Sequence, residues 1–238
     1  MTPVILAPLL ATAMMVGDFE PTASYRIRNV GGFTVLVSRK LGEHPEEAAA
    51  GIKELEKQVA EINRVVPARA LPELHRVRIW VDWDVDPDGG CVFHPSRKWL
   101  EEHAVNPDKA GCVEVSNLRH FIDWSRAVQP CMILHEMAHA YDFRVLDARD
   151  PRVSAAFRHA MEKKLYDSVE YGPGGKKRAY AATNEREYFA ELTEAYFSRN
   201  DFYPFRHDEL KAHDPEGYSA LEAVWGKPEI AREATGRP

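Results

Sequence analysis

The sequence predicts an α+β fold, with strands concentrated in the first half of the chain and helices in the second. Two stretches near the N-terminus alternate polar and apolar residues, which is typical of half-buried strands. Two later segments repeat apolar residues at helical spacing and carry histidines and glutamates beside them. At 238 residues the chain suits one domain with two lobes. We expect this domain over 18–238, with an N-terminal lobe at about 23–145 and a C-terminal lobe at about 146–238.

The N-terminal lobe is expected to hold a mixed sheet and a backing helix. Residues 25–30 and 33–38 alternate on either side of Gly31-Gly32, a pattern that predicts a hairpin. A long helix is expected over 45–66, because one proline lies in its first turn and another follows its end. Two further short strands are expected at 77–81 and 111–115.

The C-terminal lobe is expected to be mostly helical. Residues 154–165 predict one helix, and residues 184–197 predict another with a clear apolar face. Between them, residues 171–178 form a glycine-rich basic loop, which is either a linker or a lid. Residues 200–225 are rich in aromatic residues and prolines, and we expect them to pack across the back of this lobe.

The most informative pattern in the chain is His135-Glu136-x-x-His139. Histidines at i and i+4 lie on one face of a helix, close enough to bind the same zinc ion. The glutamate between them lies beside that face, where it can polarise a water molecule rather than ligate the ion. The same pattern also occurs by chance on exposed helices that bind no metal.

The residues around this pattern favour a metal site. The helix is apolar almost all round, which predicts that it is buried. Buried histidines and glutamates are unfavourable without partners. One Zn²⁺ per chain would satisfy both histidines. The apolar neighbours are Met132, Ile133, Leu134, Met137, Ala138 and Ala140.

Three glutamates on the later helix are candidates for the third protein ligand that a zinc site needs. Glu187, Glu191 and Glu194 fall at i, i+4 and i+7, on one stripe beside the apolar face. One carboxylate could bind zinc while the carboxylate of the next turn accepts a hydrogen bond from a ligating histidine. A solvated acidic face would show the same stripe.

The histidine motif is followed by a second motif, Tyr180-x-x-x-Asn184-Glu185-x-Glu187-Tyr188-Phe189-Ala190-Glu191. In order and spacing, the two motifs resemble the catalytic domain of anthrax lethal factor and its relatives among secreted bacterial metallopeptidases, including the Pro-Pro endopeptidases. The resemblance covers about 129–199. The chain departs from it at Ala138, where a glycine is common, and at Tyr188, where a phenylalanine is common.

This resemblance implies a role for each matching residue. His135, His139 and Glu187 would hold zinc. Glu136 would be the general base, and the Tyr180 hydroxyl would point into the site. The implied protein is a gluzincin, a zinc metalloendopeptidase in which a zinc-activated water hydrolyses the peptide bond.

The elements also fit a zincin-like fold, with the histidine motif on an active-site helix that forms the cleft floor. In such folds an edge strand pairs with the extended substrate. Val113–Val115 is our candidate for that strand, and an ordinary buried strand is the alternative.

The sequence leaves the roles of three residues around the site open. Glu191 and Asp142 are candidates to accept hydrogen bonds from the ligating histidines. Asp142 could instead contact the helix end or be solvated. Tyr180 could be an ordinary packed aromatic residue that precedes a helix.

Two other classes of function remain as alternatives to the endopeptidase. A zinc-dependent non-peptide amidase or cell-wall hydrolase would use the same zinc, water and glutamate. In a catalytically silent zinc-binding module, we expect the general base or the hydroxyl that stabilises the oxyanion to be lost. Glu136, the candidate base, and Tyr180, the candidate hydroxyl donor, are both present. We expect a peptide or protein substrate and a monomer. The formal charge of -6, without a basic run, argues against nucleic-acid binding.

Residues 1–17 are expected to be a signal peptide. An apolar stretch from Val4 to Val16 is too short to span a bilayer, and Ala11-Thr12-Ala13 is a candidate cleavage site. No lysine or arginine precedes the stretch, so a misplaced start or a short buried helix is the alternative. We expect a secreted, periplasmic or extracellular protein, and no membrane span elsewhere.

The chain has three cysteines, Cys91, Cys112 and Cys131. In an exported protein, Cys91 and Cys112 could form a disulfide. Three free buried thiols are the alternative, because spacing alone does not determine pairing. The chain has no C-x-x-C motif, so a second zinc site is not expected.

Overall fold

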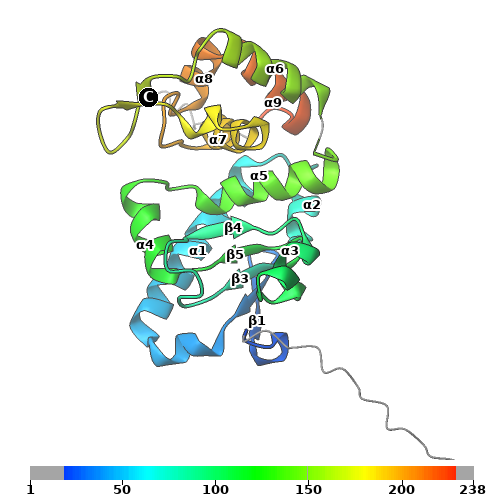
Figure 1. Cartoon of the computed structure of the whole chain (residues 1–238), viewed down its shortest axis with the longest axis vertical. Coiled ribbons are helices and arrows are strands. Elements are labelled where there is room, and N and C mark those ends of the chain that lie inside the picture. The colour runs from blue at the N-terminus through cyan, green and yellow to red at the C-terminus, as the bar shows by residue number, and fades with distance from the viewer. Residues whose placement is uncertain (1–18, 149, 229–238) are drawn as a thin grey trace, which may run out of the picture.

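The first half of the chain forms a mixed five-stranded sheet. The computed structural model describes residues 19–148 and 150–228. The strand order is β1-β2-β3-β5-β4, in which β2, β3 and β5 are parallel and the two outer strands are antiparallel to their neighbours. Figure 1 shows β1 at one end of the sheet and β4 nearest to the helical half. The strands are β1 (Arg26–Val30), β2 (Phe33–Val37), β3 (Ile79–Val81), β4 (Cys91–Phe93) and β5 (Val113–Val115).

The free edge that faces the helical half belongs to β4. The expectation that Val113–Val115 is an edge strand is wrong, because β5 pairs with β3 on one side and with β4 on the other. All three residues of β5 are buried, as expected of an ordinary buried strand. β4 has only three residues, which is too short for an alternating pattern to be recognised in the sequence.

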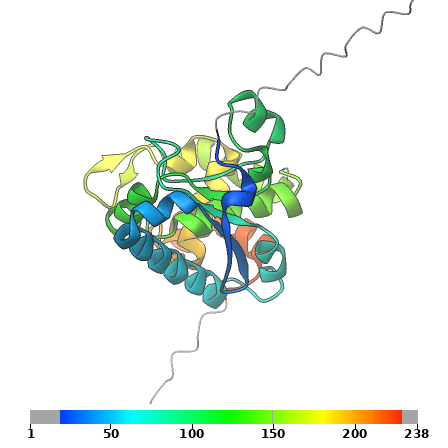
Figure 2. The same ribbon diagram turned by 90° about the horizontal axis from the view of Figure 1, so that it is seen from below.

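The predicted hairpin and backing helix are confirmed. Gly31 and Gly32 join β1 to β2 with φ angles of 55° and 95°, which glycine adopts readily. α1 (Pro45–Val65) starts at a proline and buries an apolar stripe that includes Leu55 and Val59. Figure 2 shows α1, coloured blue to teal, along one side of the strands.

The second half of the chain is mostly helical, as predicted. The remaining helices are α2 (Leu71–His75), α3 (Arg97–Glu102), α4 (Leu118–Ala127), α5 (Met132–Val145), α6 (Pro151–Glu162), α7 (Glu185–Phe197), α8 (His207–His213) and α9 (Pro215–Trp225). Figure 1 shows α5 between the sheet and the C-terminal helices, and α7 packs directly against α5. The helix expected at 154–165 starts earlier, because Asp150 caps α6 by accepting a hydrogen bond from the Arg152 N–H.

The glycine-rich segment at 171–178 contributes to a small hairpin. β6 (Val169–Glu170) pairs with β7 (Lys176–Lys177), and Tyr171 forms a bridge to Phe202. The segment therefore has secondary structure of its own, which a plain linker would lack. The lid alternative stays a prediction.

No helix within residues 19–148 and 150–228 is both long and apolar enough to cross a bilayer. The expected signal peptide over 1–17 lies outside the described residues.

The three cysteines are free, so the Cys91–Cys112 disulfide is not formed. The sheet register explains why. Cys91 is opposite Val115, and Cys112 lies three residues away along the neighbouring segment. Three residues of extended chain span about 10 Å, whereas a disulfide needs Cα atoms within about 7 Å.

Candidate metal centre

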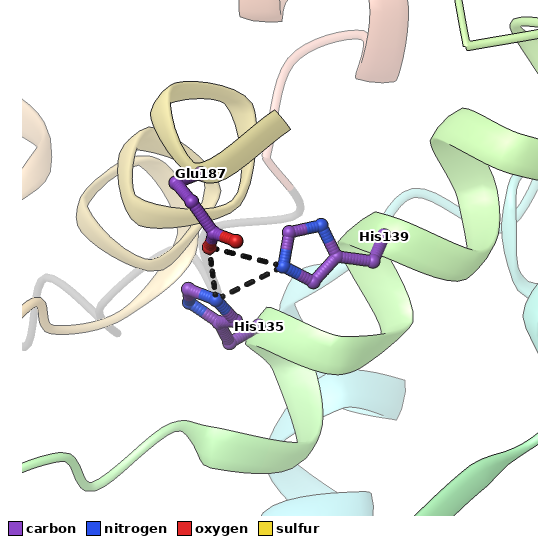
Figure 3. Close-up of side chains that lie close together, drawn as sticks. All are labelled: His135, His139 and Glu187. Atoms are coloured by element: carbon purple, nitrogen blue, oxygen red, sulfur yellow. Dashed lines mark hydrogen bonds and ion pairs between the residues drawn. The ribbon is translucent and has the colours of Figure 1, made fainter. Parts of the chain in front are cut away.

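Two histidine rings from α5 and one carboxylate from α7 point toward a common point (Figure 3). His135 and His139 lie one turn apart on α5, whose other residues are largely buried. Glu187 lies in the first turn of α7. Asn184 caps this turn by accepting hydrogen bonds from the N–H groups of Arg186 and Glu187, which holds the turn that carries the carboxylate.

The three side chains present their donor atoms as a nearly equilateral triangle. His135 Nε2, His139 Nε2 and Glu187 Oε2 are each 3.2 Å from the other two. Tetrahedral ligands at a zinc–ligand distance of about 2.0–2.1 Å are separated by about 3.4 Å. The triangle therefore has the size of three corners of a tetrahedral zinc site, and these residues could hold a metal ion.

The electrostatics of the triangle also suit a shared cation. Burial by itself raises the pKa of the Glu187 carboxyl, but hydrogen bonds from the two imidazoles outweigh burial and lower the pKa to about 2. Glu187 is therefore an anion at any ordinary pH. Two imidazole nitrogens and one carboxylate are one of the donor sets found at catalytic zinc sites.

A second carboxylate on α7 controls the protonation of His135. His135 Nδ1 donates a hydrogen bond to Glu194 Oε1 at 2.7 Å, and Gln129 Nε2 donates to the same oxygen at 2.9 Å. A carboxylate only accepts, so Nδ1 donates the proton in this bond, and Nε2 is the nitrogen that would bind a metal. Glu191, one of the two residues predicted for this role, lies farther away, with its Oε1 at 3.8 Å from Nδ1.

Glu136 lies next to the triangle and is held by the edge strand. Its Oε2 accepts a hydrogen bond from the Phe93 N–H of β4 at 2.7 Å. Burial raises the pKa of this carboxyl above its ordinary value, against the opposing effect of the two histidines. A carboxylate whose pKa is raised toward neutrality is well suited to take up and release a proton.

The remaining two predicted residues border the same cavity. Tyr180 is half-exposed, and its ring centroid lies 6.4 Å from that of His135. Asp142 is buried one turn beyond His139, and burial raises the pKa of its carboxyl. Among the described residues, the Asp142 carboxylate makes no hydrogen bond or ion pair with either histidine.

The site opens into a cavity of about 610 Å³. Its walls come from β4, α5, α7 and the segment around Tyr180. Aromatic and apolar side chains line much of it, and Arg178 and Arg186 contribute positive charge. The apolar lining includes Trp124, Met132, Phe143 and Phe202.

Sequence reasoning missed two features of the site. The contact between Phe93 N–H and Glu136 has no signal in the sequence, because it depends on which strand lies beside α5. The contact between Glu194 and His135 had a partial signal, because Glu194 belongs to the predicted acidic stripe.

No protein-family model, curated protein or solved structure matches the chain. The resemblance based on the two motifs therefore stays a prediction.

Proposed function

We propose that this protein is an exported, monomeric zinc endopeptidase with a zincin-like fold. The observation that carries the proposal is the triangle of His135, His139 and Glu187 donor atoms, with sides of 3.2 Å, beside the half-buried Glu136 in the same cavity. His135, His139 and Glu187 would hold the zinc ion. Such an ion, when bound, polarises a carbonyl and makes water a nucleophile at neutral pH.

The chain's own residues would handle the protons of the reaction. Glu136 takes a proton from the attacking water and delivers it to the leaving amine. Phe93 N–H holds Glu136 Oε2, which leaves Oε1 without a protein partner among the described residues. Tyr180 is the candidate donor to the oxyanion, because its side chain lines the same cavity.

The edge of β4 supports a peptide rather than a small amide as substrate. The Gly90 C=O accepts a hydrogen bond from the Ser116 N–H, and the His94 N–H donates one to the Cys112 C=O. These groups of Gly90 and His94 therefore face β5. Backbone direction alternates along a strand, so the N–H and C=O of Cys91 point outward, away from β5. An extended peptide can pair with these groups while its scissile bond lies near the triangle.

The test is cleavage of a diverse peptide library by the zinc-loaded wild type and by Glu136→Gln, with products identified by mass spectrometry. We expect cuts by the wild type that disappear in the variant, although both proteins bind one zinc. The expected loss follows because glutamine cannot take a proton. Cuts that persist in Glu136→Gln would contradict the role of Glu136.

Peptidoglycan, offered as a second substrate beside the library, separates the alternative functions. A non-peptide amidase or cell-wall hydrolase would bind zinc, leave the library intact and hydrolyse amide bonds in peptidoglycan. A silent module would bind zinc and cut neither substrate. Either result would overturn the endopeptidase proposal.

A further inference from the structure

A groove lies between the outer strand β1 and α1, at the end of the sheet opposite to the metal centre. β1 and β4 are the two outer strands, and β4 is the one that contacts Glu136 (Figure 1). The groove has a volume of about 580 Å³. Its lining includes the buried apolar side chains of Val37 and Leu41 and the partly buried Ile52 of α1. This groove is therefore separate from the cavity of the metal centre.

Four basic side chains line the groove, although the chain carries a formal charge of -6. Arg26 and Arg28 come from β1, Arg39 from the turn after β2, and Lys53 from α1. All four are exposed, and none forms an ion pair or a side-chain hydrogen bond within the described part of the chain. Glu56 is the one acidic residue in the described lining. Three separate segments thus bring unpaired positive charge to one groove.

β1 also offers backbone groups that have no partner strand. Its one neighbour in the described sheet is β2. Val30 pairs with Phe33 across the two-residue turn, so Val30 and every second residue before it bond to β2. The N–H and C=O groups of Ile27 and Asn29 therefore point outward, and the Ile27 side chain is 72% exposed. An open strand edge of this kind can accept a further extended strand.

The charges around this edge decide which strand it can accept. Charged residues on an edge strand often prevent unwanted pairing. That role would account for Arg26 and Arg28, but not for the two basic side chains that lie outside β1. The arginines do oppose pairing with a second copy of β1, because like charges would meet and β1 carries no acidic residue. The edge therefore favours an acidic strand.

We propose that the groove and the edge of β1 bind an extended acidic segment of a partner protein. The segment adds a strand beside β1, and its backbone pairs with Ile27 and Asn29. Residues two apart lie on one face of a strand, so Arg26 and Arg28 meet carboxylates on one face of the segment. The other two basic side chains extend this positive surface over the groove.

The test measures binding of a fluorescein-labelled peptide that alternates glutamate and valine, by fluorescence anisotropy at low ionic strength. The protein is the full chain with Glu136→Gln, so that the candidate base cannot support cleavage of the probe. We expect saturable binding that weakens as NaCl is added, because salt screens exposed charges. A peptide with glutamine in place of glutamate should bind more weakly by about tenfold or more.

Variants of β1 locate the binding surface. Arg26→Gln combined with Arg28→Gln should weaken binding of the acidic peptide by about tenfold or more. Arg158→Gln combined with Lys163→Gln removes two exposed positive charges at α6 and should leave binding unchanged. Ile27→Pro should weaken binding because it removes an outward N–H, whereas Ile27→Ala keeps that group.

Four results would overturn the proposal. The first is equal affinity for the acidic and the glutamine peptides, or no binding of either. Unchanged affinity in the arginine double variant would mean that the peptide binds elsewhere, and equal affinity of Ile27→Pro and Ile27→Ala would exclude strand pairing. Cosedimentation with phosphatidylglycerol vesicles, without peptide binding, would assign the groove to an anionic membrane surface.

A second pair of substitutions keeps the test decisive if the arginine double variant does not fold. Arg39→Gln combined with Lys53→Gln then takes its place, with the same expectations. None of these measurements uses peptidase activity, so their outcome is independent of the proposed function.

Discussion

At the scale of single residues, Glu194 lies closer to the histidine ligand His135 than Glu191 does. Its Oε1 accepts the Nδ1 proton of His135 at 2.7 Å, whereas the corresponding distance from Glu191 is 3.8 Å. The hydrogen bond fixes the imidazole tautomer and increases the basicity of Nε2. Glu194 thus acts on the metal through His135.

Glu194→Gln should weaken zinc binding by about 10–100-fold, the usual effect of removing a carboxylate behind a histidine ligand. Competition with a chromogenic zinc chelator measures the affinity. Glu162→Gln, which removes an exposed charge from the end of α6, is the matched control and should bind zinc like the wild type. Equal affinities for Glu194→Gln and the control would show that the hydrogen bond does not support the metal centre.

Tyr180→Phe tests the proposed oxyanion donor. If the hydroxyl acts only in the transition state, kcat should fall by about 10²–10³-fold while KM and zinc content stay near those of the wild type. Steady-state kinetics on one peptide from the library provides both parameters. A rise in KM with unchanged kcat would instead assign Tyr180 to substrate binding.

At the scale of elements, β4 determines what the cleft can bind. It carries an outward-facing N–H and C=O at Cys91, and its Phe93 N–H holds Glu136. One short strand thus connects the candidate substrate-binding edge with the candidate base. Proline is tolerated on an edge strand where its nitrogen faces outward, so the edge can be altered without disrupting the sheet.

Cys91→Pro should raise KM for extended peptides by about tenfold, because it removes one outward hydrogen-bond donor worth roughly 1.5 kcal/mol. Cys91→Ala keeps the N–H and is the matched control. Zinc content should be the same in both variants. Equal KM values for the two variants would show that peptides do not pair with β4 at this position.

At the scale of the whole molecule, a buried network of charges connects the sheet with Lys109, which lies in the segment before β5. Lys109 Nζ contacts Asp82 Oδ2 at 2.9 Å and Glu114 Oε1 at 2.5 Å. His94 is bonded to Glu114, and the Tyr25 hydroxyl donates to Asp82. Two buried carboxylates thus share one lysine, and their pKa values are shifted in opposite directions. Burial raises the pKa of Asp82 to about 6, whereas bonds to His94 and Lys109 outweigh burial and lower the pKa of Glu114 to about 2.

The free energy of unfolding should therefore fall as the pH rises from about 4 to about 7. Asp82 has a folded-state pKa above its unfolded value of 3.8, so its contribution is complete below pH 3.8 and is lost as the pH rises through 6. The loss is on the order of 1–3 kcal/mol. Glu114 has the opposite sign, and its contribution is lost only as the pH falls from 4.5 toward 2.

Urea unfolding of the metal-free protein at pH 4.5 and pH 7.5 measures this difference. Asp82→Asn cannot ionise and should reduce the pH dependence, whereas the exposed Asp208→Asn should leave it unchanged. Identical pH dependence in the wild type and Asp82→Asn would contradict the assignment. Removing the metal from every sample keeps the titration of the zinc-binding histidines common to all of them.

The sequence alone is sufficient to predict the parts of the molecule that depend on local geometry. A helix brings residues four apart onto one face, so the pairing of His135 and His139 follows from their spacing. The hairpin at Gly31-Gly32, the backing helix α1 and the helical character of the second half follow from equally local patterns. Assigning Glu187 to the same point depended on the family resemblance, because no local rule joins residues about fifty positions apart.

Only the tertiary structure decides which strand forms the edge and which carboxylate meets which atom. β4 occupies the edge in place of β5 because strand order depends on non-local burial of the sheet, to which a three-residue strand contributes almost no signal. Glu194 meets His135 Nδ1 because α7 packs on α5 in one particular rotation. Each of these contacts depends on how elements pack together, a property that residue spacing within one element does not encode.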